Sequence, residues 1–72
     1  MNKKNKIKIV VNGKLLTVNI KFSLKNLIGK LKTPISKVAI ELNEKIVDKK
    51  KLNKIYLKNR DKIEIVHFIG GG

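Results

Sequence analysis

The residues with the clearest potential for chemistry are the last four, 69–72, in which Gly70, Gly71 and Gly72 follow Ile69. Glycine lacks a Cβ and loses more backbone freedom on ordering than any other residue, so folding gives no reason to place three together. A segment without side chains can pass through a narrow slot in another protein and present the Gly72 carboxylate there; its four residues span roughly 13 Å when extended. A frayed chain end is the alternative. The direct junction with the apolar residue Phe68 favours a functional tail.

The other residues that could do chemistry form no recognisable catalytic or metal site. His67 is the only histidine, and without cysteine the chain has no thiolate metal site, thiol nucleophile or disulfide. The acidic residues are scattered, and their spacing indicates no acid/base pair: Glu41, Glu44, Asp48, Asp61 and Glu64. The glycines precede no helix and no Lys-Ser/Thr pair, which a phosphate-binding loop requires. We therefore expect that the protein binds no metal. We also expect that it is not an enzyme but a substrate or carrier on which enzymes act.

The formal net charge of +13 makes nucleic acid a partner to consider. The basic residues are nearly all lysines spread along the chain, with Arg60 as the one arginine, whereas specific readers of phosphates and bases favour arginine. Few aromatic residues are present to stack on bases: Phe22, Tyr56 and Phe68. We interpret the lysines as solvated surface that speeds association with acidic partners at low salt. A basic nucleic-acid-binding module remains the more remote alternative.

The length of 72 residues allows one domain with a small core. No apolar run approaches the ~18 residues of a membrane span, and no signal-type apolar stretch follows the basic N-terminus. We expect a cytoplasmic protein with no membrane partner, in three parts. These are a flexible basic arm at residues 1–6, a folded domain at residues 7–68, and a flexible glycine tail at residues 69–72.

Two strands and a helix are predicted in the first half of the folded domain. Alternating apolar residues indicate strands at residues 7–11 and 15–20, and Asn12-Gly13 between them is a strong hairpin signal. Ser23 can cap a helix of roughly nine residues, whose apolar residues share one face. We interpret that face as core: Leu24, Leu27, Ile28 and Leu31. Pro34 ends the helix. Gly29 costs about 1 kcal/mol relative to alanine, so either packing outweighs this cost or a close backbone approach requires glycine.

Further strands are predicted in the second half. Alternation indicates a strand at residues 38–42, a turn into the apolar pair 46–47, a turn or short helical segment at residues 52–57, and a last strand at residues 62–69. One helix covers only one side of a sheet, so the pattern predicts an α+β fold with a mixed sheet of four to five strands and the helix packed across one face.

The uncovered face of this sheet is expected to carry an apolar patch. Val66 and Phe68 lie on it, joined by Val10 if the first and last strands are neighbours, and exposed apolar clusters often mark an interaction surface. With Ile69 at the start of the tail, these are the candidate partner-binding residues. For Phe68, folding back onto the sheet edge is an equal alternative.

Three segments, residues 9–14, 38–47 and 61–72, together match a known pattern. They closely resemble the ThiS family, the sulfur-carrier proteins of thiamine biosynthesis. The resemblance implies a ubiquitin-like β-grasp fold with the first and last strands adjacent and parallel. The small subunit of molybdopterin synthase is similar in fold and in its Gly-Gly ending, but is usually longer, with proline before its tail. That family, another ubiquitin-like sulfur carrier and a protein modifier remain open alternatives.

The resemblance also implies a mechanism. In the family, an activating enzyme of the ThiF type uses ATP and Mg²⁺ to adenylate the terminal carboxylate, which here is that of Gly72. Sulfur supplied from cysteine by a cysteine desulfurase then displaces AMP, and the thiocarboxylate donates it to a thiazole synthase of the ThiG type. Gly70 and Gly71 would be the approach that threads into the enzyme. The carrier itself would bind no cofactor, since the sulfur is held covalently at Gly72.

Overall fold

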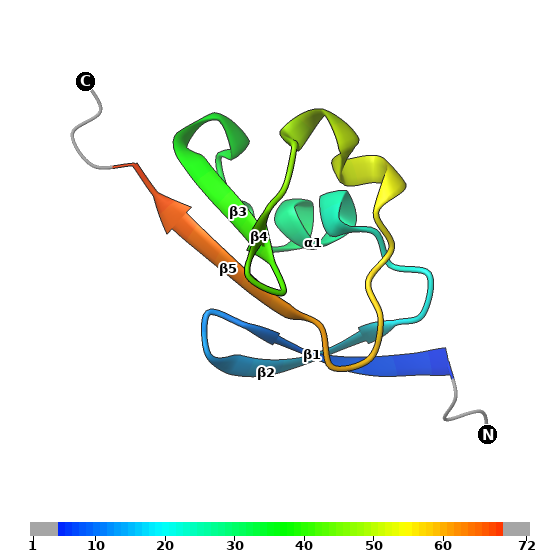
Figure 1. Ribbon diagram of the computed structural model, residues 1–72. Coiled ribbons are helices and arrows are strands. Elements are labelled where there is room, and N and C mark those ends of the chain that lie inside the picture. Colours follow the sequence, from blue (N-terminus) through cyan, green and yellow to red (C-terminus); the bar gives the residue numbers. More distant parts are fainter. Residues whose placement is uncertain (1–4, 69–72) are drawn as a thin grey trace.

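Five strands, one α-helix and two 3-10 helices are formed by residues 5–68, which are the residues that the computed structural model describes. In chain order they are β1 (Lys6–Val11), β2 (Lys14–Asn19), α1 (Leu24–Lys30), η2 (Ile35–Lys37), β3 (Val38–Leu42), β4 (Lys45–Ile46), η3 (Lys49–Lys54) and β5 (Lys62–His67). The sheet order is β2-β1-β5-β3-β4, and α1 lies across one side of it (Figure 1). Strands β1 and β5 are parallel and the other neighbours antiparallel. The α+β fold with a mixed sheet and adjacent, parallel first and last strands is confirmed.

The turn between β1 and β2 also fastens β1 to β5. Asn12 and Gly13 both have positive φ, 50° and 82°, as expected for a two-residue hairpin turn. The backbone N–H of Asn12 donates to Ile63 O at 2.9 Å, and its side-chain Oδ1 accepts from Ile65 N at 2.7 Å. The side chain of Asn12 therefore continues the hydrogen bonding of β5 past the point where β1 ends. Strand β1 begins at Lys6, one residue inside the predicted arm.

Helix α1 begins as predicted but ends earlier. Ser23 Oγ accepts from Asn26 N at 3.0 Å, and Asn26 Oδ1 accepts from Ser23 N at 3.1 Å, so a capping box closes the first turn. The helix has seven residues and ends at Lys30, after which Lys32 adopts a φ of 56°. Leu31 is 39% exposed, and its assignment to the core was wrong. Leu31 keeps helical φ and ψ, and its N–H donates to Leu27 O at 3.0 Å, so it stays in line with the apolar stripe. It lies at the very end of the helix, where it lines a surface pocket and is not enclosed by the core.

The core lies between α1 and the face of the sheet that it covers. Its fully buried side chains come from both layers and from η3: Ile9, Leu24, Leu27, Val38, Ile40, Leu52 and Ile63. Burying each such side chain contributes roughly 1.5–3 kcal/mol, and a chain of this size has few of them to lose. A Cβ at Gly29 would meet nothing within 4 Å, so no close approach explains that glycine. No helix within residues 5–68 is long and apolar enough to cross a membrane.

Candidate functional site

The end of β5 is where the folded domain leads into the glycine residues. On one side β5 pairs with β3 over its whole length, from Leu42 opposite Ile63 to Val38 opposite His67. Phe68 continues this pairing, because its backbone N–H donates to Lys37 O at 3.0 Å. On the other side the pairing with β1 is confined to the start of β5, where Val11 is opposite Ile63. The chain therefore leaves the sheet at Phe68 anchored on one side. Ile69, Gly70, Gly71 and Gly72, predicted as the tail, lie outside the described residues.

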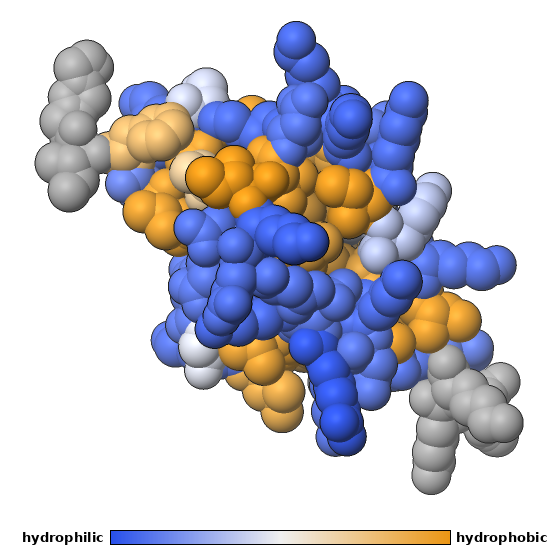
Figure 2. Space-filling view, in the orientation of Figure 1, coloured by the Kyte–Doolittle hydropathy of each residue, from blue (hydrophilic) through white to orange (hydrophobic). Residues whose placement is uncertain are grey.

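The uncovered face beside this exit carries exposed apolar side chains. Val66 is 53% exposed and Phe68 is 56% exposed, so both side chains reach the surface. Ala39 lies opposite Val66 on β3, and Ile46, on β4, is 78% exposed. We refer to Ala39, Ile46, Val66 and Phe68 as the open-face patch. Figure 2 shows apolar surface beside the end of β5 and hydrophilic side chains over much of the rest of that side.

Val10 does not belong to the open-face patch. It lies opposite Lys62, which is four residues before Val66, so about 13 Å of strand separates the two positions. Its side chain is also half-buried. The resemblance to the ThiS family correctly implied that the first and last strands are neighbours. It could not give the register, which brings the end of β1 to the beginning of β5 and leaves the end of β5 beside β3 alone.

Two of the acidic residues form a pair that the sequence spacing concealed. Glu41 on β3 is directly opposite Glu64 on β5, and both are half-buried on the uncovered face. Like charges directly opposite each other destabilise a sheet. The other three acidic residues have roles in turns: Asp48 caps η3, Asp61 accepts from Asn43 and Lys58, and Glu44 lies 3.8 Å from Lys62. The acidic pair lies next to Ile46, which is opposite Glu41.

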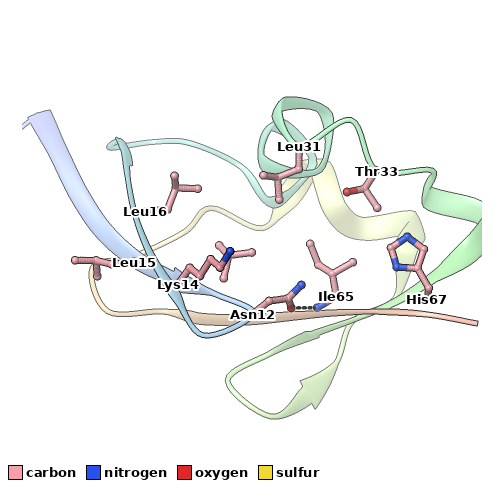
Figure 3. Close-up of a pocket in the computed structure, with 9 residues that line it drawn as sticks. Asn12, Lys14, Leu15, Leu16, Leu31, Thr33, Ile65 and His67 are labelled. Carbon is pink, nitrogen blue, oxygen red and sulfur yellow. Dashed lines mark hydrogen bonds between the residues drawn. The ribbon is translucent and has the colours of Figure 1, made fainter.

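A pocket of about 450 Å³ lies on the other side of β5, between the β1–β2 turn and the end of α1. Figure 3 shows Leu31 and Thr33 on one side of it, with Ile65 and His67 of β5 on the other. Its lining residues are Val11, Asn12, Lys14, Leu15, Leu16, Leu31, Thr33, Ile65 and His67. No carboxylate is among them, and residues 5–68 contain no group of histidine and acidic residues that could hold a metal ion. The pocket thus gives His67 no partner for acid/base chemistry.

Comparison with known proteins gives consistent matches. The sequence model described as the ThiS family matches residues 9–72. A crystal structure of the thiamine biosynthesis protein ThiS from Geobacter metallireducens has a TM-score of 0.80 and 29% identity, over 92% of this chain and 100% of that one. The sulfur carrier protein ThiS of Bacillus subtilis is 49% identical over 35 residues, which are 49% of this chain and 53% of that protein.

A larger relative contains a similar segment. The thiazole synthase of Paramagnetospirillum magneticum is 38% identical over 66 residues, which are 92% of this chain. This chain spans only about a fifth of the length of that enzyme, 20%. The similarity therefore concerns one part of the thiazole synthase.

Proposed function

The chain belongs to the ThiS family, and on that basis we propose that it is a sulfur carrier for thiazole synthesis. The observation that carries the proposal is the family match, which runs from the hairpin through all three glycines to Gly72. In the proposed reaction the Gly72 carboxylate is the group that is chemically changed. The folded domain holds the glycine tail and is recognised by the enzymes that act on it, so the chain itself is a substrate.

The proposed chemistry begins with activation, because a carboxylate is a poor electrophile. An activating enzyme of the ThiF type joins the Gly72 carboxylate to AMP, using ATP and Mg²⁺ and releasing pyrophosphate. The terminal sulfur of a cysteine persulfide, supplied by a desulfurase, then forms a C–S bond as the C–O bond to AMP breaks. A second thiol reduces the remaining S–S bond and is itself oxidised to a disulfide. The product is a thiocarboxylate on Gly72, with Gly70 and Gly71 as the side-chain-free approach.

The open-face patch is the proposed docking surface for the activating enzyme. Val66 and Phe68 are both more than half exposed. Apolar side chains that are exposed in this way add little to the stability of the fold, and clusters of them often mark an interaction surface. Phe68 precedes Ile69 and the tail, so an enzyme bound to the patch has the glycines within reach of its active site. Aromatic residues at the centre of an interface commonly contribute a large share of the binding energy, and Phe68 is the aromatic residue of the patch.

Thiazole synthase is the proposed sulfur acceptor. The support is that an enzyme named thiazole synthase contains a segment 38% identical to this chain within its own polypeptide. A carrier joined covalently to its acceptor acts at a high effective concentration, which is useful only when the two work together. Molybdopterin synthase is the alternative acceptor, since its small subunit has the same type of fold and ending. The two acceptors are separated by experiment.

The proposal is tested by intact mass and peptide mass spectrometry. The protein is incubated with an activating enzyme, ATP, Mg²⁺, cysteine and a cysteine desulfurase. The expected result is a mass gain equal to sulfur replacing one oxygen, confined to the C-terminal peptide, and its loss when Gly72 is deleted. An unchanged mass, with the same enzymes active on another carrier, would reject the proposal and lead to a salt titration of nucleic-acid binding.

The acceptor and the threading of the tail are tested with the charged protein. Thiazole synthase is expected to consume the thiocarboxylate, and the large subunit of molybdopterin synthase to leave it intact. Gly71→Trp is expected to abolish charging, because an indole cannot pass through a slot shaped for glycine, while the folded domain keeps its stability. Normal charging of Gly71→Trp would show that no narrow slot is involved. Gly71→Ala is the matched control for the loss of glycine flexibility.

A further inference from the structure

Lys49, the first residue of η3, has contacts that set it apart among the basic residues of the described chain. Its Nζ donates to Val38 O at 2.7 Å and to Ile35 O at 3.0 Å. The same Nζ lies 5.3 Å from the centre of the Phe68 ring, which is within the range of a cation–π contact. One ammonium group therefore joins the start of η3, the start of β3 and the residue at which the chain leaves β5.

The carbonyl groups bound by Lys49 lie at an edge of the sheet. Ile40 O accepts from Val47 N, which comes directly after β4, so Ile40 O points toward the β4 side of β3. Alternate residues of a strand direct their carbonyls to the same side, and Val38 O therefore points to that side as well. Strand β4 is too short to reach Val38, because its two residues pair with Glu41 and Leu42. The Lys49 ammonium takes the place of the missing strand there.

The position of Lys49 is fixed by its own surroundings. Asp48 caps η3, since its Oδ1 accepts from Lys50 N at 2.9 Å and its backbone O accepts from Lys51 N at 2.9 Å. The backbone of Lys49 is thereby held in the first turn of η3, and the side chain is half-buried. A long side chain with two hydrogen bonds and a half-buried stem loses most of its rotamer freedom. Phe68 is thus in contact with a cation that is fixed in place.

We propose that Lys49 is a positioning residue for the strand exit, acting through Phe68 to fix the direction in which the tail leaves β5. Phe68 is held at two points, by its backbone N–H to Lys37 O and by its ring to Lys49 Nζ. A residue held at two points has a set orientation, so the residues after it start from a set direction. The inference rests on the proposed function, because a fixed exit matters only if the tail must enter an enzyme. A tail whose starting direction already points toward the active site of the enzyme loses less conformational entropy when its carboxylate reaches the reacting position.

The test compares Lys49→Met with two matched variants. Lys51→Met removes the same charge from an exposed lysine of η3, and Lys49→Arg keeps a donor that can reach carbonyls and stack on the ring. The rate of adenylation at saturating carrier, kcat, is expected to fall roughly three- to tenfold in Lys49→Met, as the loss of one such contact predicts. KM is expected to change less, since Val66 and Ile46 still dock. Lys51→Met and Lys49→Arg are expected to have the same kcat and KM as the original protein. Denaturant unfolding checks that all variants fold.

A second readout separates positioning from a purely structural role. In the Phe68→Leu background no ring is present, so Lys49→Met is expected to have little further effect on kcat. An equal effect in both backgrounds would mean that Lys49 acts only through the β3 edge and would overturn the inference. Equal losses in Lys49→Met and Lys51→Met would overturn it too, because charge alone would then explain them.

The inference and the proposed function fail in different ways. If the original protein is adenylated and Lys49→Met is adenylated equally fast, the inference alone is wrong. If the original protein is never adenylated, the proposed function is wrong, and amide hydrogen exchange of the full-length protein alone still tests the contact. Lys49→Met is expected to speed exchange of the Phe68 N–H, whereas Lys51→Met is not. Unchanged exchange of that N–H would contradict the positioning of Phe68 by Lys49.

Discussion

Strand β5 has two faces that share one backbone and differ in what covers them. On the side facing α1, Ile63 is 0% exposed and Ile65 is 8% exposed. On the other side Glu64 is half-buried and Val66 is 53% exposed. The hydrogen bonds to β3 are common to both faces, so the difference lies in the side chains and in the single helix above one of them (Figure 1). A face without a covering layer gains little from apolar residues, and those on it are available for partners.

The first prediction tests this difference with the same kind of change on each face. Ile63→Ala is expected to lower the free energy of unfolding by about 2–5 kcal/mol, because it leaves a cavity in the core. Val66→Ala on the opposite face is expected to change it by no more than about 0.5 kcal/mol. Denaturant titrations followed by circular dichroism measure both values. Similar losses for the two variants would show that the uncovered face also holds the fold together.

The second prediction concerns the uncovered face, where a substitution is expected to change binding and not stability. Phe68→Asp is expected to weaken binding to the activating enzyme by tenfold or more, roughly the effect of losing a central aromatic contact. Tyr56→Asp is the control, since Tyr56 is 57% exposed and Phe68 56%, and Tyr56 lies beside Ser23, away from the patch. Calorimetric titration measures the affinity, and both variants should keep their stability. An unchanged affinity for Phe68→Asp would mean that this side chain lies outside the interface.

The covered face was predictable from the sequence because its signals are local. Alternating apolar residues, the Asn12-Gly13 turn and the Ser23 cap each depend on a few neighbouring residues. The helix is shorter than predicted for a local reason as well, since Lys32 takes a positive φ that lysine gives no reason to expect. The resemblance to the ThiS family then implied the parallel pairing of the first and last strands.

The uncovered face was less predictable because it depends on register. Val10 was expected beside Phe68, and the register places it beside Lys62. The pairing of Glu41 with Glu64 likewise follows only from the alignment of β3 and β5. Lys49 could not be recognised among 18 basic residues, because its hydrogen bonds join segments that meet only in the folded chain. Functional residues on such a face need a structure to be identified.

The third prediction concerns the layer that makes one face covered. Gly29 is helical and exposed, its Cβ position is open, and its φ is not positive, so alanine fits without strain. Gly29→Ala is expected to raise the free energy of unfolding by about 0.5–1 kcal/mol, because alanine loses less backbone freedom on folding. Affinity for the activating enzyme should not change. Destabilisation in a thermal or denaturant melt would indicate a requirement for glycine beyond the helix itself.

The last prediction concerns a cost that the uncovered face carries. Glu41 and Glu64 lie directly opposite each other in a protein whose net charge is +13, so each glutamate is repelled by its neighbour and attracted by the lysines. Single substitutions to glutamine mix these two effects. A double-mutant cycle compares the effect of Glu64→Gln in the original protein with its effect in the Glu41→Gln protein. The attraction of Glu64 to the lysines is the same in both proteins and cancels, which leaves the interaction between the two glutamates.

This coupling is expected to be unfavourable by a few tenths of a kcal/mol, toward the lower end of the ~0.2–1 kcal/mol range for cross-strand pairs, because both side chains still contact water. Glu64→Gln should therefore destabilise the Glu41→Gln protein more than it destabilises the original protein. A favourable coupling in denaturant titrations would mean that a cation bridges the two carboxylates. The uncovered face would then contribute to the stability of the fold, and stability would not be confined to the face of β5 that α1 covers.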